Sequence, residues 1–295
     1  MAPDSELVSA RELLRQTEAL FGGGDVGDSP MAKFAQRTLD RARETQDYES
    51  EALAYFYSLY PWVFVTDEAV LLARIDEARR RCEFLAVRRA VWLLEDLKAH
   101  VLAVKGRHQE AITIAQRLDR VPEALRPPFE RGITLMLMAR YCAWIGRLDD
   151  ALRLAHRVAK LAESSEHELW RAATCVLLGG LLTRDALNPE EGLPYLERAR
   201  SMLAHRPVSL TTLICTAQLV TAYGMLGAPE RAYAVFEEDL SRPGARALLT
   251  PRPMAMVETM RSRLAAALIG TGRLAEAQAW LDEFEPEAYG THFYR

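Results

Sequence analysis

The sequence predicts an all-α fold, a right-handed superhelical solenoid of about seven antiparallel helix pairs. Apolar residues recur at helical spacing almost throughout, as in Ala90, Leu93, Leu94, Leu97 and Val101. Strand-type patterns are nearly absent, because the one β-branched cluster, at 63–66, is too short to form a strand. A short turn phrase also returns about every 40 residues, which is typical of stacked helical repeats.

The turn phrase consists of a glycine, a few polar residues, an acid, a small residue and then an apolar helix. Four copies are complete, at 106–111, 146–151, 227–232 and 272–277. One degenerate copy and two weaker ones extend the series, at 187–192, 66–69 and 29–32. The small residues that end the seven copies, taken in chain order, are 37, 42, 40, 41, 40 and 45 positions apart.

Each part of the phrase has a physical role in a helical hairpin. The glycine supplies the left-handed backbone that ends the first helix. The acid lies in the first turn of the second helix, where the helix dipole favours negative charge. The small residue lets the two helices approach closely. Each unit leaves an apolar face that only its neighbour can cover, so the units are expected to stack.

The repeats follow one another along a single array that spans residues 1–295. The second helix of the first pair is expected to begin at Ser29-Pro30 and that of the fifth at Asn188-Pro189, because each site combines a cap residue with proline at the first helical position. The last residues, 286–295, are interpreted as a tail or as a truncated next helix. The predicted repeats are 5–46, 47–84, 86–121, 129–163, 168–204, 208–241 and 253–285.

The turn phrase resembles that of the tetratricopeptide repeat, in which a Gly-Asp/Arg-x-x-Glu-Ala segment joins helix A to helix B. Tyr223 and Phe236 fall on aromatic core positions of that family, and Gly180 falls on its small position in helix A. The resemblance covers residues 5–286. With its longer period, the chain is more similar to the sensor and interaction repeats of bacterial regulators, such as the maltose-regulon activator type or repeat-bearing diguanylate cyclases.

This resemblance implies a non-catalytic module that binds a protein or peptide in a concave groove lined by helix A of every repeat. Such a module would be the regulatory or sensory segment of a bacterial signalling or transcription regulator. Two alternatives stay open, a small-molecule-sensing domain of such a regulator and a stand-alone adaptor or dimerisation scaffold. The tail at 286–295 favours either a segment of a longer regulator or a homodimer formed through this end.

Composition and charge narrow the choice of partner. The chain has 37 Lys and Arg against 41 Asp and Glu, a net charge of −4, which gives no general attraction to nucleic acid or to anionic lipid. The longest apolar run, 172–182, has 11 residues and is too short to span a bilayer. The chain starts without a secretory signal pattern, and its four cysteines are scattered singly. We therefore expect a cytoplasmic protein that neither binds nucleic acid nor inserts into membranes.

No residue pattern predicts catalysis, a cofactor or a metal site. The glycine-rich segment 22–27 follows a helix and lacks a lysine, so it is interpreted as a connector and not as a phosphate loop. The six histidines are dispersed, and paired carboxylates such as Asp149 and Asp150 are explained by helix caps and solvation. An enzymatic function is not expected.

The densest basic cluster consists of five arginines around one predicted helix end: Arg79, Arg80, Arg81, Arg88 and Arg89. Cations at a helix C-terminus complement the helix dipole, so a solvated helix end is one interpretation. Contact with an anion or a partner is the other. No aromatic residues alternate with these arginines in the sequence as they do in proteins that stack nucleic-acid bases.

The resemblance also selects the residues that would line the groove. Arginine and tryptophan are typical anchors of protein interfaces, and methionine adapts to varied partners. Trp144 and Met225 could equally pack between repeats. Asp96, Leu177 and Thr221 also map to the groove-facing positions. The groove residues that we predict as the partner site are Trp62, His100, Met136, Arg140, Trp144, Arg184 and Met225.

Overall fold

The computed structural model describes residues 8–21, 29–249 and 255–282, and within these ranges every regular element is a helix. This confirms the predicted all-α repeat fold. The predicted connector at 22–27 and the tail at 286–295 lie outside the described residues. Two compact units divide the chain, residues 1–146 and 147–295. None of the described helices is long and apolar enough to cross a bilayer.

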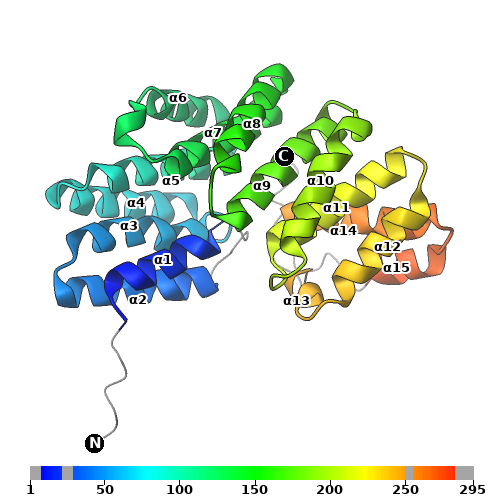
Figure 1. Cartoon of the computed structure of the whole chain (residues 1–295), viewed down its shortest axis with the longest axis horizontal. Coiled ribbons are helices and arrows are strands. Elements are labelled where there is room, and N and C mark those ends of the chain that lie inside the picture. Colours follow the sequence, from blue (N-terminus) through cyan, green and yellow to red (C-terminus); the bar gives the residue numbers. More distant parts are fainter. Residues whose placement is uncertain (1–7, 22–28, 250–254, 283–295) are drawn as a thin grey trace, which may run out of the picture. The chain divides into compact units, whose positions relative to one another are not determined.

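Unit 1 contains three complete helix pairs and the first helix of a fourth (Figure 1). In each pair, helix A leads through a turn to helix B. A short 3-10 helix, η1 (Tyr60–Trp62), extends α3, and another, η2 (Glu123–Leu125), follows α6. The α-helices of unit 1 are α1 (Ala10–Leu20), α2 (Pro30–Thr45), α3 (Tyr48–Leu59), α4 (Glu68–Phe84), α5 (Arg88–Val104), α6 (His108–Asp119) and α7 (Pro128–Trp144).

Unit 2 begins with a B helix and continues with three further pairs. A π-helical turn, η3 (Leu181–Asp185), ends α9, and a short extra helix follows α12. The α-helices are α8 (Leu148–Glu163), α9 (Glu168–Gly180), α10 (Pro189–Leu203), α11 (Leu210–Met225), α12 (Pro229–Ser241), α13 (Ala245–Leu249), α14 (Ala255–Gly270) and α15 (Leu274–Asp282). All fourteen helices of the predicted pairs are therefore present. The organisation of both units as one continuous array stays a prediction.

The turns have the backbone geometry that the turn phrase predicts. Positive φ angles occur at all four glycines of the complete copies: Gly106, Gly146, Gly227 and Gly272. Leu187 takes the same place in the fifth repeat with a φ of 52°, a conformation that disfavours a side chain. Gln46 and Ala86, one repeat apart, adopt this conformation where helix B leads to the next helix A. Helix hairpins thus repeat with the same local geometry.

The caps and small residues also follow the prediction. Ser29 and Asn188 accept hydrogen bonds from the first-turn amides of α2 and α10, and proline follows each of them. Ala111 and Ala151 are fully buried where helix B begins. Gly192 occupies this position in the fifth repeat and allows the closest helix approach: a Cβ there would lie 2.7 Å from the carbonyl oxygen of Gly179 and against Thr183.

One buried arginine joins three helices of unit 1. Arg126, between η2 and α7, donates to the Asp96 carboxylate of α5 at 2.8 Å and to the Glu130 carbonyl of α7 at 3.1 Å. It also donates to the Leu118 carbonyl near the end of α6. Thr134 of α7 donates to the same Asp96 carboxylate. Because a buried charge is costly unless it is paired, this network fixes how the three helices meet.

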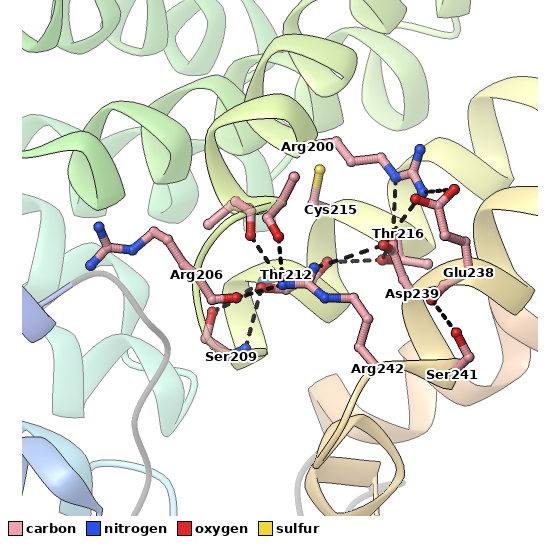
Figure 2. A network of polar contacts seen from close by, with 12 residues as sticks. Arg200, Arg206, Ser209, Thr212, Cys215, Thr216, Glu238, Asp239, Ser241 and Arg242 are labelled. Atoms are coloured by element: carbon pink, nitrogen blue, oxygen red, sulfur yellow. Dashed lines mark hydrogen bonds and ion pairs between the residues drawn. The ribbon is translucent and has the colours of Figure 1, made fainter.

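A comparable network joins α10, α11 and α12 in unit 2, and Figure 2 shows it. The buried Asp239 of α12 accepts from Thr216 of α11 at 2.7 Å and from Arg200 of α10 at 3.2 Å. Arg242, directly after α12, donates to three carbonyl oxygens at the end of α10, those of Leu203, Ala204 and Arg206. The regular hydrogen bonds of the helix stop at this end, so Arg242 caps the C-terminus of α10.

The close approach of α9 and α10 predicts the effect of two glycine substitutions. Gly192→Ala should destabilise the chain by about 2 kcal/mol or more, because the new Cβ meets the Gly179 backbone. Gly224→Ala is the matched control, since Gly224 is also helical and its Cβ would meet nothing within 4 Å. That change should stabilise by up to about 1 kcal/mol. Denaturant unfolding checks both, and equal effects would contradict the close-packing argument.

Candidate functional site

The predicted groove residues of unit 1 have very different surroundings. Trp62, at the end of η1, is half-buried, and so is Arg140 of α7. Trp144, the last residue of α7, is 47% exposed. In contrast, His100 of α5 and Met136 of α7 are 1% and 3% exposed. These two side chains are buried and not accessible to a partner, which corrects their expected position. Asp96, also mapped to the groove, is equally buried.

His100 is the centre of a ladder of aromatic rings on successive A helices. Its imidazole is stacked on Tyr60, with ring centroids 5.7 Å apart, and on Tyr141, 6.3 Å away. The Tyr141 hydroxyl lies 3.4 Å from His100 Nδ1, and Phe64 contacts the ring edge-on. Burial and the nearby Arg140 guanidinium lower the pKa of His100 to about 3. The imidazole is therefore neutral and acts as an inter-repeat core residue.

The exposed end of this ladder is formed by Trp144. Its indole packs on Tyr141 and on His108 of the neighbouring helix α6, with centroids 5.9 and 5.7 Å away. Arg140 lies one helical turn before Trp144, so both occupy the same face of α7. Of the five residues predicted in unit 1, Arg140 and Trp144 are therefore the pair that combines accessibility with a shared face.

Both groove residues predicted in unit 2 are accessible. Arg184, in the π-helical turn η3, is exposed and forms a two-bonded ion pair with Asp185. Met225, the last residue of α11, is 44% exposed. Thr221, one turn before it, is half-buried, whereas Leu177 of α9 is buried. Helices α9, α11 and α14 contact one another in this order, so these residues belong to one layer of A helices.

Arg263 of α14 is a functional candidate that sequence reasoning missed. It is half-buried, and it forms no ion pair with the described residues. Burial lowers the pKa of Arg263, and the nearby Arg184 guanidinium lowers it further, whereas Asp185 opposes the shift. Two guanidiniums thus lie near each other in the A-helix layer of unit 2, and the Asp185 carboxylate that is bonded to Arg184 lies close enough to act on Arg263. In the sequence Arg263 is one of two arginines, with Arg261, in a largely apolar helix, and this pattern does not distinguish it from a solvated arginine.

The described residues offer little for catalysis. They contain no group of three or more His, Cys, Asp or Glu residues that could hold a metal ion. All four cysteines are buried, and none of them forms a disulfide. Burial raises the pKa of Cys82 to about 12 and also raises the pKa of Cys175 and Cys215, which keeps these thiols protonated and unreactive.

Buried carboxylates have structural partners. Burial raises the pKa of Asp96 to about 6, although the Arg126 guanidinium and Thr134 favour its charged form. Burial likewise raises the pKa of Glu130, which is paired with Arg89. Each of these acids bridges two helices and has no open space beside it that a substrate would need. No sequence pattern indicates Arg126, because its partners lie on three different helices.

The fold is similar to that of solved TPR-like repeat proteins. A putative kinesin light chain from Podosopora anserina with nearly identical TPR-like repeats has a TM-score of 0.50 and 20% identity, over 64% of this chain and 90% of that one. BtubC (BKLC) from P. vanneervenii has a TM-score of 0.56 and 17% identity, over 73% of this chain and 87% of that one. The apo form of RapI has a TM-score of 0.58 and 9% identity, over 93% and 75%.

These identities show the fold alone: the chain has a TPR-like, all-α repeat fold. No protein-family model matches the sequence, and no curated protein is similar to it.

The lowered pKa of His100 predicts a pH dependence of stability. Below pH 6.5 the unfolded chain binds a proton at this residue, whereas the folded chain does so only near pH 3. Stability from this site is therefore lost as the pH falls. Between pH 7 and pH 5 the wild type should lose roughly 2 kcal/mol more unfolding free energy than His100→Phe, which keeps a stacked ring.

Urea unfolding at both pH values measures this difference. Met136→Leu is the control, because it changes a buried residue of unit 1 that does not titrate, and it should keep the wild-type pH dependence. If the unfolding free energy of the wild type and of His100→Phe falls by the same amount between pH 7 and pH 5, the imidazole becomes charged in the folded state and the argument is wrong.

Proposed function

We propose that the chain is a non-catalytic repeat module that binds a protein or peptide on the A-helix layer of its repeats. Protein interaction is what a TPR-like fold is commonly used for, and the stacked A helices provide an extended surface for it. In the predicted context this module is the regulatory or sensory segment of a bacterial signalling or transcription regulator in the cytoplasm.

The observation that carries this proposal is the pair of guanidiniums in unit 2. Arg184 and Arg263 lie close enough to affect each other electrostatically, and among the described residues the Asp185 carboxylate acts on both, as the ion-pair partner of Arg184 and as a nearby negative charge for Arg263. The exposed Met225, on the A helix between them, adds an apolar contact. A peptide that carries a carboxylate beside an apolar side chain complements this arrangement, because arginine binds carboxylates with two parallel hydrogen bonds.

In unit 1, Arg140 and Trp144 offer the same combination of a cation and an apolar side chain. Tryptophan and arginine dominate the binding energy of many protein interfaces. His100 and Met136 lie beneath the surface and support it, so their substitution is expected to affect stability more than affinity. This separation of roles replaces the uniform groove that the sequence predicts.

Peptides selected from a displayed random library on the full chain provide the test. Arg184→Ala and Met225→Ala should each lower the affinity for the selected peptides by about tenfold or more, which is about 1.4 kcal/mol of binding free energy. Arg153→Ala is the matched control in unit 2, since Arg153 is an exposed arginine on helix B α8. The affinity of the Arg153→Ala variant for the selected peptides should stay within about twofold of that of the wild type.

Two outcomes would contradict the proposal. One is that selected peptides bind equally well to the Arg184 and Met225 variants, which would place their site elsewhere. The other is that no peptide is enriched while a small metabolite raises the melting temperature, which would favour a small-molecule sensor.

A further inference from the structure

A second surface of unit 1 lies where helix B of one repeat leads to helix A of the next. Two aromatic side chains are exposed on this edge. Phe84, the last residue of α4, is 80% exposed, and Tyr48, the first residue of α3, is 50% exposed. Most exposed apolar residues of a protein occur singly and have smaller side chains, so two exposed rings on adjacent helices call for an explanation.

A buried carboxylate beneath these rings holds two arginines. The Glu51 side chain of α3 is only 2% exposed. It accepts from Arg81 Nε at 3.1 Å and from Arg81 Nη2 at 3.2 Å. Arg43 of α2 forms an ion pair with the same carboxylate at 3.6 Å. Since one negative charge serves two guanidiniums, the cluster keeps a net positive charge.

The aromatic rings fix the two guanidiniums further. Arg81 lies over the Phe84 ring, 5.6 Å from its centroid, and Arg43 lies over the Tyr55 ring at 5.8 Å. Arg43 also donates to the Tyr55 hydroxyl at 2.9 Å. These hydrogen bonds, with Tyr55 for Arg43 and with Glu51 for Arg81, raise the pKa of both arginines. A partner would therefore meet side chains that are already ordered, which lowers the entropic cost of binding.

The basic cluster that the sequence shows divides into two groups here. Arg79 and Arg89 are neutralised, by Glu83 and Glu130. Arg80 and Arg88 are exposed and form no ion pair among the described residues. Arg80 precedes Phe84 by one helical turn, so both lie on the same face of α4. Arg88 begins α5, immediately after the turn that follows Phe84.

A recess lies beside Tyr48 and extends the surface. Its lining comes from the start of α1 and from the segment that joins α2 to α3, and it carries both charges, from Arg11, Arg41, Asp47 and Glu49. Arg11 is paired with Asp47, and Arg41 with Glu44. The Nε atom of Arg41 is buried and has no hydrogen-bond partner within the described residues. The edge therefore combines exposed rings, unpaired cations and a concave site.

We propose that this edge, formed by Tyr48, Arg80, Arg81, Phe84 and Arg88, docks an acidic segment of a partner protein. Carboxylates of the segment pair with Arg80 and Arg88, and an apolar side chain packs on the exposed face of Phe84. Charge complementarity selects the partner, because cations outnumber carboxylates around the rings. Arg80 and Arg88 form no ion pair among the described residues, and Arg43 and Arg81 share the single carboxylate of Glu51, whereas Glu49 and Glu77 contribute exposed carboxylates beside the rings. This site is separate from the A-helix layer and does not depend on the function proposed for that layer.

The observations favour a protein segment over a nucleic acid. Arginines already cover one face of the Phe84 and Tyr55 rings, so few ring faces are left for stacked bases. Two unpaired arginines also make a short track for a phosphate backbone. Exposed Tyr, Phe and Arg side chains around a buried ion pair are, in contrast, the usual composition of a protein interface.

Random dodecapeptides displayed on phage, selected on the full chain and counter-selected on Phe84→Ala, test the proposal. The surviving peptides should be rich in Asp and Glu and carry at least one apolar residue. Phe84→Ala and Arg88→Glu should each weaken them about tenfold or more, and the affinity should fall as salt is raised. Because both positions are exposed, neither change should alter the helix content.

Two variants of α4 provide matched controls. Val70→Ala removes an exposed apolar side chain at the other end of the helix, and Arg74→Glu changes the net charge as Arg88→Glu does. Both should leave the affinity within about twofold of the wild type. Equal losses in Arg74→Glu and Arg88→Glu would show a general charge effect and overturn the site.

Two further results would overturn the proposal. One is that no peptide depends on Phe84, or that the dependent peptides lack acidic residues. The other is that labelled oligothymidine binds the wild type more tightly than any selected peptide and loses this binding in Phe84→Ala, which would assign the edge to nucleic acid.

Discussion

The stacking of each repeat on the next in a constant register is the constraint on which both units depend. Side chains one repeat apart contact each other: His100 and Tyr141 are separated by 41 residues, and Arg200 and Asp239 by 39. Ion pairs follow the same interval, as between Glu68 and Arg107, 39 residues apart. Because these positions contact residues about one repeat away, their side chains must fit the neighbouring repeat as well as their own helix pair.

This register explains why the interior of the repeats contains so many charged groups. Helix ends meet at each level of a stack, and their carbonyls need donors that the helices cannot supply. Arg126 in unit 1 and Arg242 in unit 2 supply them from equivalent loops, and each also lies near a buried aspartate. Buried ion pairs contribute little net stability, but loss of one partner is costly, so they specify one arrangement of the helices.

The sequence predicts the helices better than the site, because helix ends depend on residues within one turn, whereas the site depends on contacts between helices. Glycine, acid and alanine act within one turn, so the phrase at 227–232 predicts its hairpin without any knowledge of the neighbours. Whether a residue of helix A faces solvent or the next repeat depends on about 100° of rotation per residue. His100 and Met136 face the interior of the stack, whereas Trp144 faces solvent. Arg126 and Glu51 acquire their roles from contacts between helices, which no pattern within one helix reports.

The burial of all four cysteines has a practical consequence for the study of this protein. Cys82, Cys142, Cys175 and Cys215 lie inside the units, and free thiols in such places react slowly with alkylating reagents. A cysteine introduced at an exposed turn position would then be the one fast-reacting thiol among the described residues. With one cysteine introduced in each unit, the chain can therefore carry a pair of fluorophores. Energy transfer between the two dyes would then report how the distance between the units changes when a partner binds.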